Sequence, residues 1–281
     1  MLTATLTVLG IVLAAVVLLC LYIYVSQERM LFYPRPNDPE LRAHWRWQRV
    51  EIPSGRQVLE GWWADGGAPE SGLTLIYFGG NAEDVLFAAR NAGRIDAKRM
   101  LVVNYRGYGG TPGKPSQRAL FEDALAVYDY ALGPGGAEPR ELVVMGRSLG
   151  SGVATMLAAK RNVRAAILVT PFDSIKAVAA RHYPAILVDR LLRHPFPSTD
   201  FAPRATAPAL FLIAANDNVI APSHARALAR VWGGEKQVHT FANVGHNDID
   251  MHPDYYAVLN GFLQSLAQSN TTPQNLRTEP L

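Results

Sequence analysis

The sequence predicts an α/β fold, in which a mostly parallel central sheet is flanked by helices and preceded by one transmembrane helix. Three observations predict it. Apolar segments of strand length alternate with helical segments along most of the 281 residues. One such strand runs directly into the tight turn Gly-Arg-Ser-Leu-Gly at residues 146–150. Ahead of the domain, residues 2–25 form an uncharged apolar run that is long enough to cross a bilayer.

Residues 1–26 are expected to form a retained, single-pass membrane anchor. A helix over the uncharged run would span about 36 Å, more than the hydrocarbon core of about 30 Å. A cleaved signal peptide is one alternative, but the basic start and the small residues of a cleavage site are both missing. A buried core helix is the other, but the run has no polar face. Arg29, Arg35, Arg42 and Arg46 follow the run and no Lys or Arg precedes it, which predicts a cytoplasmic domain.

The segment at residues 27–44 is expected to connect the anchor to an α/β domain at residues 45–269, which a polar tail at 270–281 follows. The domain should open with a β-hairpin within residues 45–63. Strands at 73–78 and 100–105 should then alternate with helices at 82–95 and from 115 onward. The second of these helices has an apolar face at helical spacing, formed by Leu120, Ala124, Val127, Tyr128 and Ala131.

Three later segments, at 141–145, 165–170 and 209–214, are almost continuously apolar, as expected for strands that helices cover on both faces. A short strand at 238–241 and a helix at 255–267 complete the pattern. A parallel sheet carries its functional groups at the carboxyl ends of its strands. About residues 172–206 interrupt the alternation with a helical stretch at 177–192 and several prolines, and this segment is expected to form a small lid over that end.

The turn at residues 146–150 has the G-x-S-x-G pattern of a nucleophile elbow, between an apolar strand and a helix of small residues. Gly146 and Gly150 allow the tight reversal and the close approach of the helix, because neither has a side chain. Ser148 would then stand exposed at the tip as a nucleophile. The alternative is an ordinary strand–helix turn bounded by glycines.

A serine hydroxyl needs a base that accepts its proton and a carboxylate that orients the base. In a fold with this elbow, the acid and then the histidine follow the serine along the chain. Asp217 comes directly after the strand at 209–214, and His246 comes after the last strand, beside Gly245. We therefore predict Ser148, Asp217 and His246 as the catalytic residues.

Other residues compete for these roles. Asp217 can also be read as a turn or helix-capping aspartate; Asp173 lies near a strand end and is a reserve acid, whereas Asp200 lies in the lid. His252 is the main rival of His246. Two further histidines are placed less well, namely His224 within a predicted helix and His44 ahead of the sheet.

Acyl transfer also requires N–H groups that meet the developing oxyanion. The N–H of Leu149, next to the nucleophile, is one expected donor. The second should come from the loop after the strand at 73–78, where Gly79 and Gly80 allow a close approach and the N–H of Asn81 is the expected donor. Without the partners above, this loop would be read as an ordinary turn.

Taken together, the motifs resemble membrane-anchored α/β-hydrolases of the serine-aminopeptidase-like family, from the end of the anchor to about residue 265. The matching segments lie at 27–34, 77–83, 104–110, 146–152 and 170–174, in the loop of Asp217 and at 245–246. The resemblance implies an α/β-hydrolase fold with Ser148 as nucleophile, Asp217 as acid and His246 as base. One departure is visible, because Gly79 replaces the histidine of the His-Gly-Asn loop that is usual in the family.

The remaining composition limits the partners. A net charge of +3 without a basic stripe argues against nucleic acid, and the single cysteine, Cys20, excludes an intramolecular disulfide. No Cys/His cluster has the spacing of a metal site, and we expect no metal or other cofactor. We expect the membrane as one partner and a small acyl-ester, thioester or lipid as the substrate.

These features predict a membrane-anchored serine hydrolase that cleaves a carboxylic ester or thioester. The lid composition fits an acyl chain with an anionic head, through Tyr183, Ile186, Leu187, Val188, Leu191, Leu192, Arg181, Arg190 and Arg193. A serine peptidase or amidase of the same fold is the first alternative, and an aminopeptidase should place acidic residues for the substrate's amino group. A non-catalytic scaffold is the second, and it would ordinarily have lost part of the triad.

Overall fold

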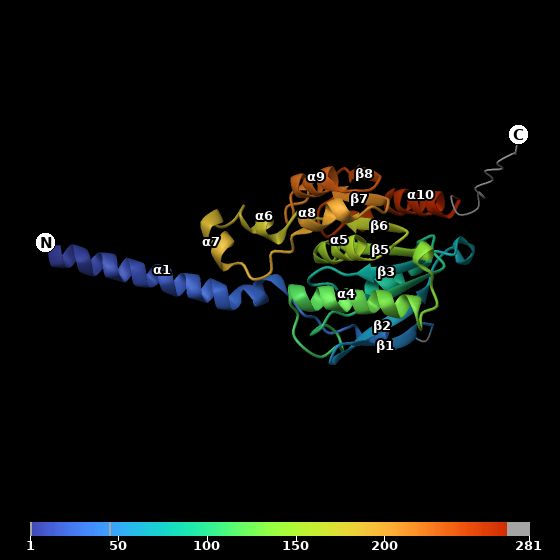
Figure 1. Ribbon diagram of the computed structural model, residues 1–281, viewed down its shortest axis with the longest axis horizontal. Coiled ribbons are helices and arrows are strands. Elements are labelled where there is room, and N and C mark those ends of the chain that lie inside the picture. Colours follow the sequence, from blue (N-terminus) through green and yellow to red (C-terminus); the bar gives the residue numbers. More distant parts are fainter. Residues whose placement is uncertain (1, 45, 269–281) are drawn as a thin grey trace, which may run out of the picture.

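The computed structural model describes residues 2–44 and 46–268, so the predicted tail at 270–281 lies outside the described residues. Within them the predicted α/β fold is confirmed, as an eight-stranded sheet in the order β1-β2-β4-β3-β5-β6-β7-β8 (Figure 1). β1 and β4 pair antiparallel with β2, and the other neighbours are parallel. The strands are β1 (Gln48–Ser54), β2 (Gln57–Asp65), β3 (Thr74–Phe78), β4 (Arg99–Val103), β5 (Leu142–Arg147), β6 (Ala165–Val169), β7 (Ala209–Ala214) and β8 (Lys236–Phe241).

Helices cover both faces of this sheet. α4, α5 and α9 pack on one face, and α3 and α10 pack on the other. The α-helices are α1 (Leu2–Leu31), α2 (Pro39–Arg42), α3 (Leu86–Arg90), α4 (Gln117–Leu132), α5 (Leu149–Lys160), α6 (Ile175–Ala179), α7 (Ala185–Leu191), α8 (Ser198–Phe201), α9 (Pro222–Val231) and α10 (Tyr255–Gln268). Short 3-10 helices lie at η1 (Pro69–Ser71), η2 (Ala92–Arg94), η3 (Pro139–Glu141), η4 (Ala202–Arg204) and η5 (Ile249–Met251).

Strand β3 shows why the central strands are apolar along their whole length. Successive side chains of a strand point to opposite faces of the sheet. Ile76 therefore belongs to the core under α4 and α5, whereas Leu75 belongs to the core under α3 and α10. Both residues are fully buried. With both faces covered, no position of such a strand is left for a polar residue.

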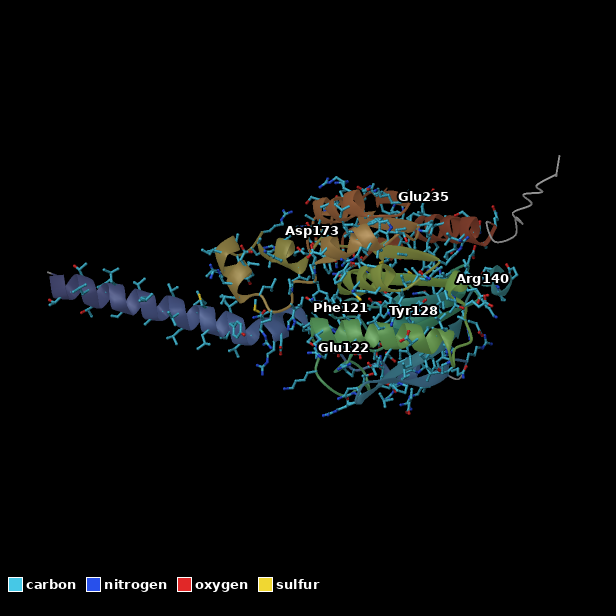
Figure 2. All side chains as sticks on the ribbon, viewed as in Figure 1. Phe121, Glu122, Tyr128, Arg140, Asp173 and Glu235 are labelled. Atoms are coloured by element: carbon cyan, nitrogen blue, oxygen red, sulfur yellow. The ribbon has the colours of Figure 1, made fainter. Side chains whose placement is uncertain are left out.

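The carboxyl ends of the parallel strands face α1 and the lid. Figure 2 shows Asp173, which follows β6, on the side of the domain nearest α1. Arg140, which immediately precedes β5, lies at the opposite end of the domain in the same view. The end of the sheet at which this fold places its functional groups is therefore the end from which the N-terminal helix departs.

Helix α1 leads away from the domain (Figure 1) and is long and apolar enough to cross a membrane by length and composition. Its most apolar window is not buried against the rest of the protein. The helix continues to Leu31, beyond residue 26, at which the sequence predicted the anchor to end. No Pro or Gly interrupts residues 27–31, and the ring of Pro34 first prevents further helical hydrogen bonding.

Two other predicted helices are shorter than expected. The helix expected at 82–95 is reduced to α3 and η2, because residues 79–85 form a loop at the carboxyl end of β3. The helical stretch expected at 177–192 is divided into α6 and α7. Pro184 lies at this break as the residue that precedes α7, and proline disfavours a helical residue before it.

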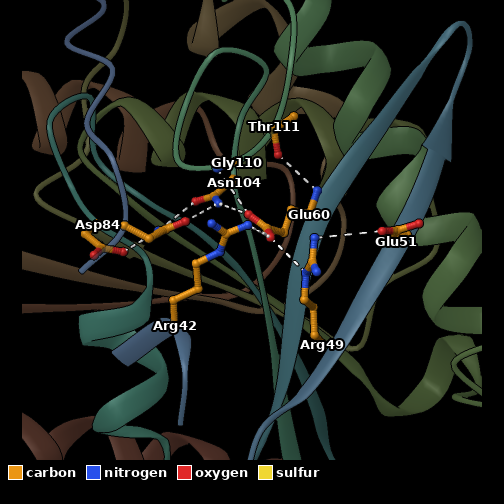
Figure 3. Close-up of polar contacts among 9 residues, drawn as sticks. Arg42, Arg49, Glu51, Glu60, Asp84, Asn104, Gly110 and Thr111 are labelled. Atoms are coloured by element: carbon orange, nitrogen blue, oxygen red, sulfur yellow. Dashed lines mark hydrogen bonds and ion pairs between the residues drawn. The ribbon is translucent and has the colours of Figure 1, made fainter. Parts of the chain in front are cut away.

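A polar cluster around Glu60 holds the connector on the domain (Figure 3). The carboxylate of Glu60 on β2 accepts hydrogen bonds from Arg42 Nη2 at 2.6 Å and from Arg49 Nε at 2.8 Å, and its side chain is only 4% exposed. Asp84 accepts hydrogen bonds from Asn37 Nδ2 at 2.6 Å and from the N–H of Asp38 at 2.7 Å. The bonds to Asp84 fix the connector against the loop that follows β3, and the pair of Arg42 with Glu60 fixes it against β2.

Candidate active site

Ser148 lies in the sharp turn between β5 and α5, with a φ of 51° that is unusual for a residue other than glycine. The glycines on either side explain how the turn is accommodated. A Cβ on Gly146 would collide with the backbone of Gly150, and a Cβ on Gly150 would collide with the carbonyl of Phe78. The pattern Gly-x-Ser-x-Gly is therefore required by backbone contacts on both sides of the serine.

His246 lies in the loop after β8 and contacts both other predicted residues. Its Nε2 is 2.8 Å from Ser148 Oγ, and its Nδ1 is 2.7 Å from Asp217 Oδ2. A carboxylate can only accept hydrogen bonds, so the Nδ1 of a neutral ring carries the proton and Nε2 is the acceptor that faces Ser148. The backbone of this loop is itself held, because the N–H of Gly245 donates to Asp248 Oδ1 at 2.7 Å.

Asp217 is almost fully buried in the loop after β7, and its second oxygen is also satisfied. Asp217 Oδ1 accepts hydrogen bonds from the N–H groups of Val219, at 2.9 Å, and Ile220, at 2.7 Å. These two bonds leave Oδ2 directed at His246. The turn-forming role considered as an alternative is therefore present as well, and the two roles use different oxygens of one carboxylate.

The competing residues are placed elsewhere. Asp173 pairs with His224, with 2.9 Å between Asp173 Oδ1 and His224 Nδ1, and Asp200 is exposed on α8. His252 packs against the ring of Phe241 at 4.9 Å between centroids. The remaining rival, His44, stacks on Trp47.

The loop after β3 lies directly beside the serine. A Cβ added to Gly80 would be 3.8 Å from the Cβ of Ser148. The N–H of Gly80 donates to Glu83 Oε2 at 2.7 Å, whereas no hydrogen bond from the N–H of Asn81 is found within the described residues. Leu149 is the first residue of α5, and the first N–H groups of a helix have no partner within it. Asn81 and Leu149 line the same cavity as Ser148, and their N–H groups are available as donors.

Tyr108 holds this loop in place, a role that the sequence did not indicate. Its hydroxyl donates to the carbonyl of Asn81 at 2.7 Å and accepts from the N–H of Tyr33 at 3.1 Å. Burial raises the pKa of Tyr108, so the hydroxyl keeps its proton at neutral pH. Tyr105 adds a second support by donating to the carbonyl of Gly79 at 2.9 Å. The only available signal was the Tyr-Arg-Gly-Tyr segment after β4, which by itself is typical of many turns.

A cavity of about 550 Å³ opens over Ser148 and His246. One wall is polar and includes Asn81, Glu83 and Arg147. The apolar part of the lining comes from the end of α1, the start of the lid and the loop of Asp217, namely Met30, Leu31, Phe172, Ile175, Val178, Ala179, Val219 and Ile220. Among the described residues, no group of three or more His, Cys, Asp or Glu side chains is arranged to hold a metal ion.

Comparison with known proteins places this geometry among hydrolases. A family model described as serine hydrolase matches residues 136–259. An uncharacterized protein of Mycobacterium tuberculosis is 30% identical over 237 residues, which cover 82% of this chain and 84% of that protein. Protein bem46 of Schizosaccharomyces pombe is 28% identical and covers 90% of this chain and 91% of its own length. Human α/β-hydrolase domain-containing protein 17C is 30% identical over 70% of this chain and 59% of that protein.

Solved structures support the same fold. An esterase of Pyrococcus furiosus superposes with a TM-score of 0.62 at 16% identity, covering 84% of this chain and 97% of the esterase. A proline iminopeptidase of Mycobacterium smegmatis superposes with a TM-score of 0.63 at 14% identity, covering 79% of this chain and all (100%) of that enzyme. Esterases and peptidases both superpose at such low identity. These likenesses therefore establish the fold, and the substrate has to be inferred from the residues of the site.

Proposed function

This chain belongs to the α/β-hydrolase family of serine hydrolases, and we propose that it is a membrane-anchored enzyme that cleaves carboxylic ester or thioester bonds. Ser148 is the proposed nucleophile, His246 the base and Asp217 the residue that orients the base. The hydrogen bond of 2.8 Å between Ser148 Oγ and His246 Nε2 supports this most directly. A serine whose hydroxyl faces an oriented imidazole is activated for attack on a carbonyl carbon.

The reaction then proceeds in two halves. Ser148 Oγ attacks the acyl carbon while His246 Nε2 accepts its proton, and the N–H groups of Leu149 and Asn81 stabilise the oxyanion. His246 gives the proton to the departing alcohol or thiol, which leaves an acyl group on Ser148. Water enters, transfers a proton to His246 and attacks the acyl carbon, and the carboxylic acid is released as Ser148 regains its proton. Asp217 stabilises the imidazolium that forms in each half.

The walls of the cavity favour an acyl substrate over a peptide with a free amino group. An aminopeptidase needs a carboxylate that is available to the substrate's ammonium group. Among the described lining residues the acidic side chain is Glu83, and its negative charge interacts with the guanidinium of Arg147, which lines the same cavity. Oε1 accepts from Tyr77 and Oε2 from the N–H of Gly80. The apolar wall formed by Leu31, Phe172 and their neighbours suits a hydrocarbon chain instead.

A serine-directed fluorophosphonate probe and short p-nitrophenyl esters test the proposed chemistry. We expect one labelled residue, Ser148, and hydrolysis of the esters by the purified chain. Ser148→Ala should abolish labelling and lower turnover by a factor on the order of 10⁵–10⁶. Labelling that persists in Ser148→Ala would show that the nucleophile is another residue, and a folded wild-type chain that is neither labelled nor active would support the scaffold alternative.

Helix α1 supports the membrane part of the proposal, with the hydrolase domain on the cytoplasmic face. The apolar window of α1 is not covered by the domain, and Arg29 and Arg35 follow it on the domain side. Protease added to sealed spheroplasts should therefore leave the domain intact, and detergent should expose it. Digestion of the domain without detergent would show that it lies on the outer face of the membrane. Release of the protein by carbonate washing would exclude a spanning anchor.

A further inference from the structure

A second cavity, of about 250 Å³, lies between the end of α1 and the lid. It will be called the α1–α7 cavity, and its lining includes Ile23 and Gln27 from α1 and Leu187 and Val188 from α7. Figure 1 shows α6 and α7 beside the part of α1 that adjoins the domain. Met30, Leu31, Ile175 and Ala179 line both this cavity and the cavity over Ser148. The two spaces are therefore adjacent and have common walls.

Specific polar contacts hold α1 against the lid, so that the shape of this cavity is defined. Gln27 is 8% exposed, and its amide donates to the carbonyl of Leu191 at 3.0 Å and accepts from the N–H of Arg193 at 2.7 Å. The guanidinium of Arg193 forms an ion pair with Glu28 at 2.9 Å. One turn of α1 is thereby tied to the last residue of α7 and to Arg193 beyond it.

The end of α1 is also tied to the loop that faces the nucleophile. The side-chain amide of Asn81 donates to the carbonyl of Leu31 at 3.1 Å, and the N–H of Tyr33 donates to the carbonyl of Asn81 at 3.1 Å. Leu31 is thus in contact with the loop of the proposed oxyanion hole while it lines both cavities. The anchor helix ends as part of the wall of the site.

The lining of the α1–α7 cavity suits hydrocarbon. Its side chains are apolar apart from the hydroxyl of Tyr183 and the amide of Gln27, and that amide is already bonded to the lid on both sides. Ile23 lies near the end of the uncharged run, at the level at which a spanning helix leaves the bilayer. Ile186, the neighbour of Leu187 on α7, is 69% exposed, as expected for a lid that touches lipid.

We propose that the α1–α7 cavity binds the distal part of a long acyl chain that belongs to a lipid ester of the bilayer, with the ester carbonyl at Ser148. The inference rests on the proposed function and adds that the anchor helix itself is a wall of the substrate site. The acyl chain enters between α1 and α7 from the bilayer and does not have to cross water. Each methylene that is buried on the way should raise kcat/KM by up to about fourfold.

Blocking variants with matched controls test this site in the full-length, detergent-solubilised protein. Leu187→Trp fills the cavity from α7, whereas Val231→Trp adds a tryptophan at an exposed position of α9 that lines neither cavity. Ile23→Trp fills it from α1, and Leu21→Trp, at an exposed position of the same helix, is its control. With p-nitrophenyl dodecanoate the blocking variants should lose at least about tenfold in kcat/KM, which corresponds to the loss of two buried methylenes. With the butanoate ester they should stay close to wild type.

The butanoate ester and the fluorophosphonate probe separate the possible failures. Absence of butanoate hydrolysis and of labelling in the wild type would overturn the proposed function, and this inference with it. A wild type that hydrolyses butanoate but not dodecanoate would overturn only the inference. So would blocking variants that hydrolyse dodecanoate as well as their controls do. If Leu187→Trp also loses butanoate hydrolysis through misfolding, the Ile23→Trp pair decides the result.

The route from the bilayer is tested in phosphatidylcholine vesicles that contain a fluorogenic dodecanoyl glycerolipid. Hydrolysis should be fast when the enzyme and the glycerolipid share one bilayer and at least about tenfold slower when they are in separate vesicles, because the slow step is then transfer of the lipid through water. Equal rates in the two arrangements would overturn entry between α1 and α7.

Discussion

The Nε2 atom of His246 lies 2.8 Å from Ser148 Oγ, although 98 positions of the chain separate the two residues. Each stands in a loop at the carboxyl end of a parallel strand, Ser148 after β5 and His246 after β8. Asp217, which follows β7 and so lies between them in the chain, contacts the other ring nitrogen of His246. The shared edge of one sheet therefore brings together side chains that no local segment connects.

His246→Ala and Asp217→Asn should both abolish most ester hydrolysis without unfolding the protein. Loss of the base should lower turnover by a factor on the order of 10⁵–10⁶, and loss of the orienting carboxylate by a factor on the order of 10⁴. Hydrolysis of p-nitrophenyl butanoate measures the change, and circular dichroism checks the fold.

Asp173→Asn and His252→Ala are the matched controls for these two variants. Asp173 pairs with His224, and His252 packs on Phe241, so neither change reaches the hydrogen bonds of His246. Both variants should keep activity within a few fold of wild type. If His252→Ala were inactive and His246→Ala active, the proposed base would be wrong.

Tyr108→Phe should lower kcat by tenfold to about a hundredfold and leave KM almost unchanged. The lost hydroxyl positions the backbone of Asn81, and a small displacement of a proposed oxyanion donor affects the transition state more than the bound ester. Steady-state kinetics on a short ester make the measurement. Tyr128→Phe is the control, because its hydroxyl bonds the carbonyl of Asn162 away from the site. Equal effects of the two variants on kcat would argue against this positioning role.

Gly150→Ala should destabilise the domain by more than about 3 kcal/mol, because the added methyl group collides with the carbonyl of Phe78 at the end of β3. Gly93→Ala, where nothing lies within 4 Å of an added Cβ, should change the free energy of unfolding by less than about 1 kcal/mol. Chemical unfolding in detergent compares the two variants. A Gly150→Ala protein as stable as wild type would contradict the close packing of β3, β5 and α5.

Acid should lower the stability of the folded protein through His194, which is buried beside Glu28 of α1. Burial lowers the pKa of His194 in the folded protein, and the nearby carboxylate of Glu28 opposes this effect only in part. The unfolded chain therefore takes up the proton more readily, so the free energy of unfolding should fall as the pH drops through the ordinary histidine value of about 6.5. Unfolding curves at pH 8 and pH 5 measure the loss, and His194→Phe should reduce it. An unchanged pH dependence in that variant would exclude His194 as its source.

Local patterns were enough to predict much of this molecule. The alternation of apolar strands and helices predicts the layers, because a strand covered on both faces has no room for polar residues. The Gly-x-Ser-x-Gly turn predicts the position of Ser148, because only glycines fit beside that backbone. The uncharged run predicts a helix of membrane-spanning length, since length and apolar composition are sufficient for that prediction.

Contacts between distant segments decided the rest. The position of Asp217 directly after a strand already favoured it over Asp173 in the sequence. Its hydrogen bond to His246 forms because β7 and β8 are neighbours, while Asp173 meets His224 on α9. The attachment of α1 to the lid through Gln27 also depends on residues more than a hundred positions away. The sequence by itself determines which secondary structure each segment forms. Which aspartate or histidine functions in the site is decided by the partner that packing brings within hydrogen-bond distance.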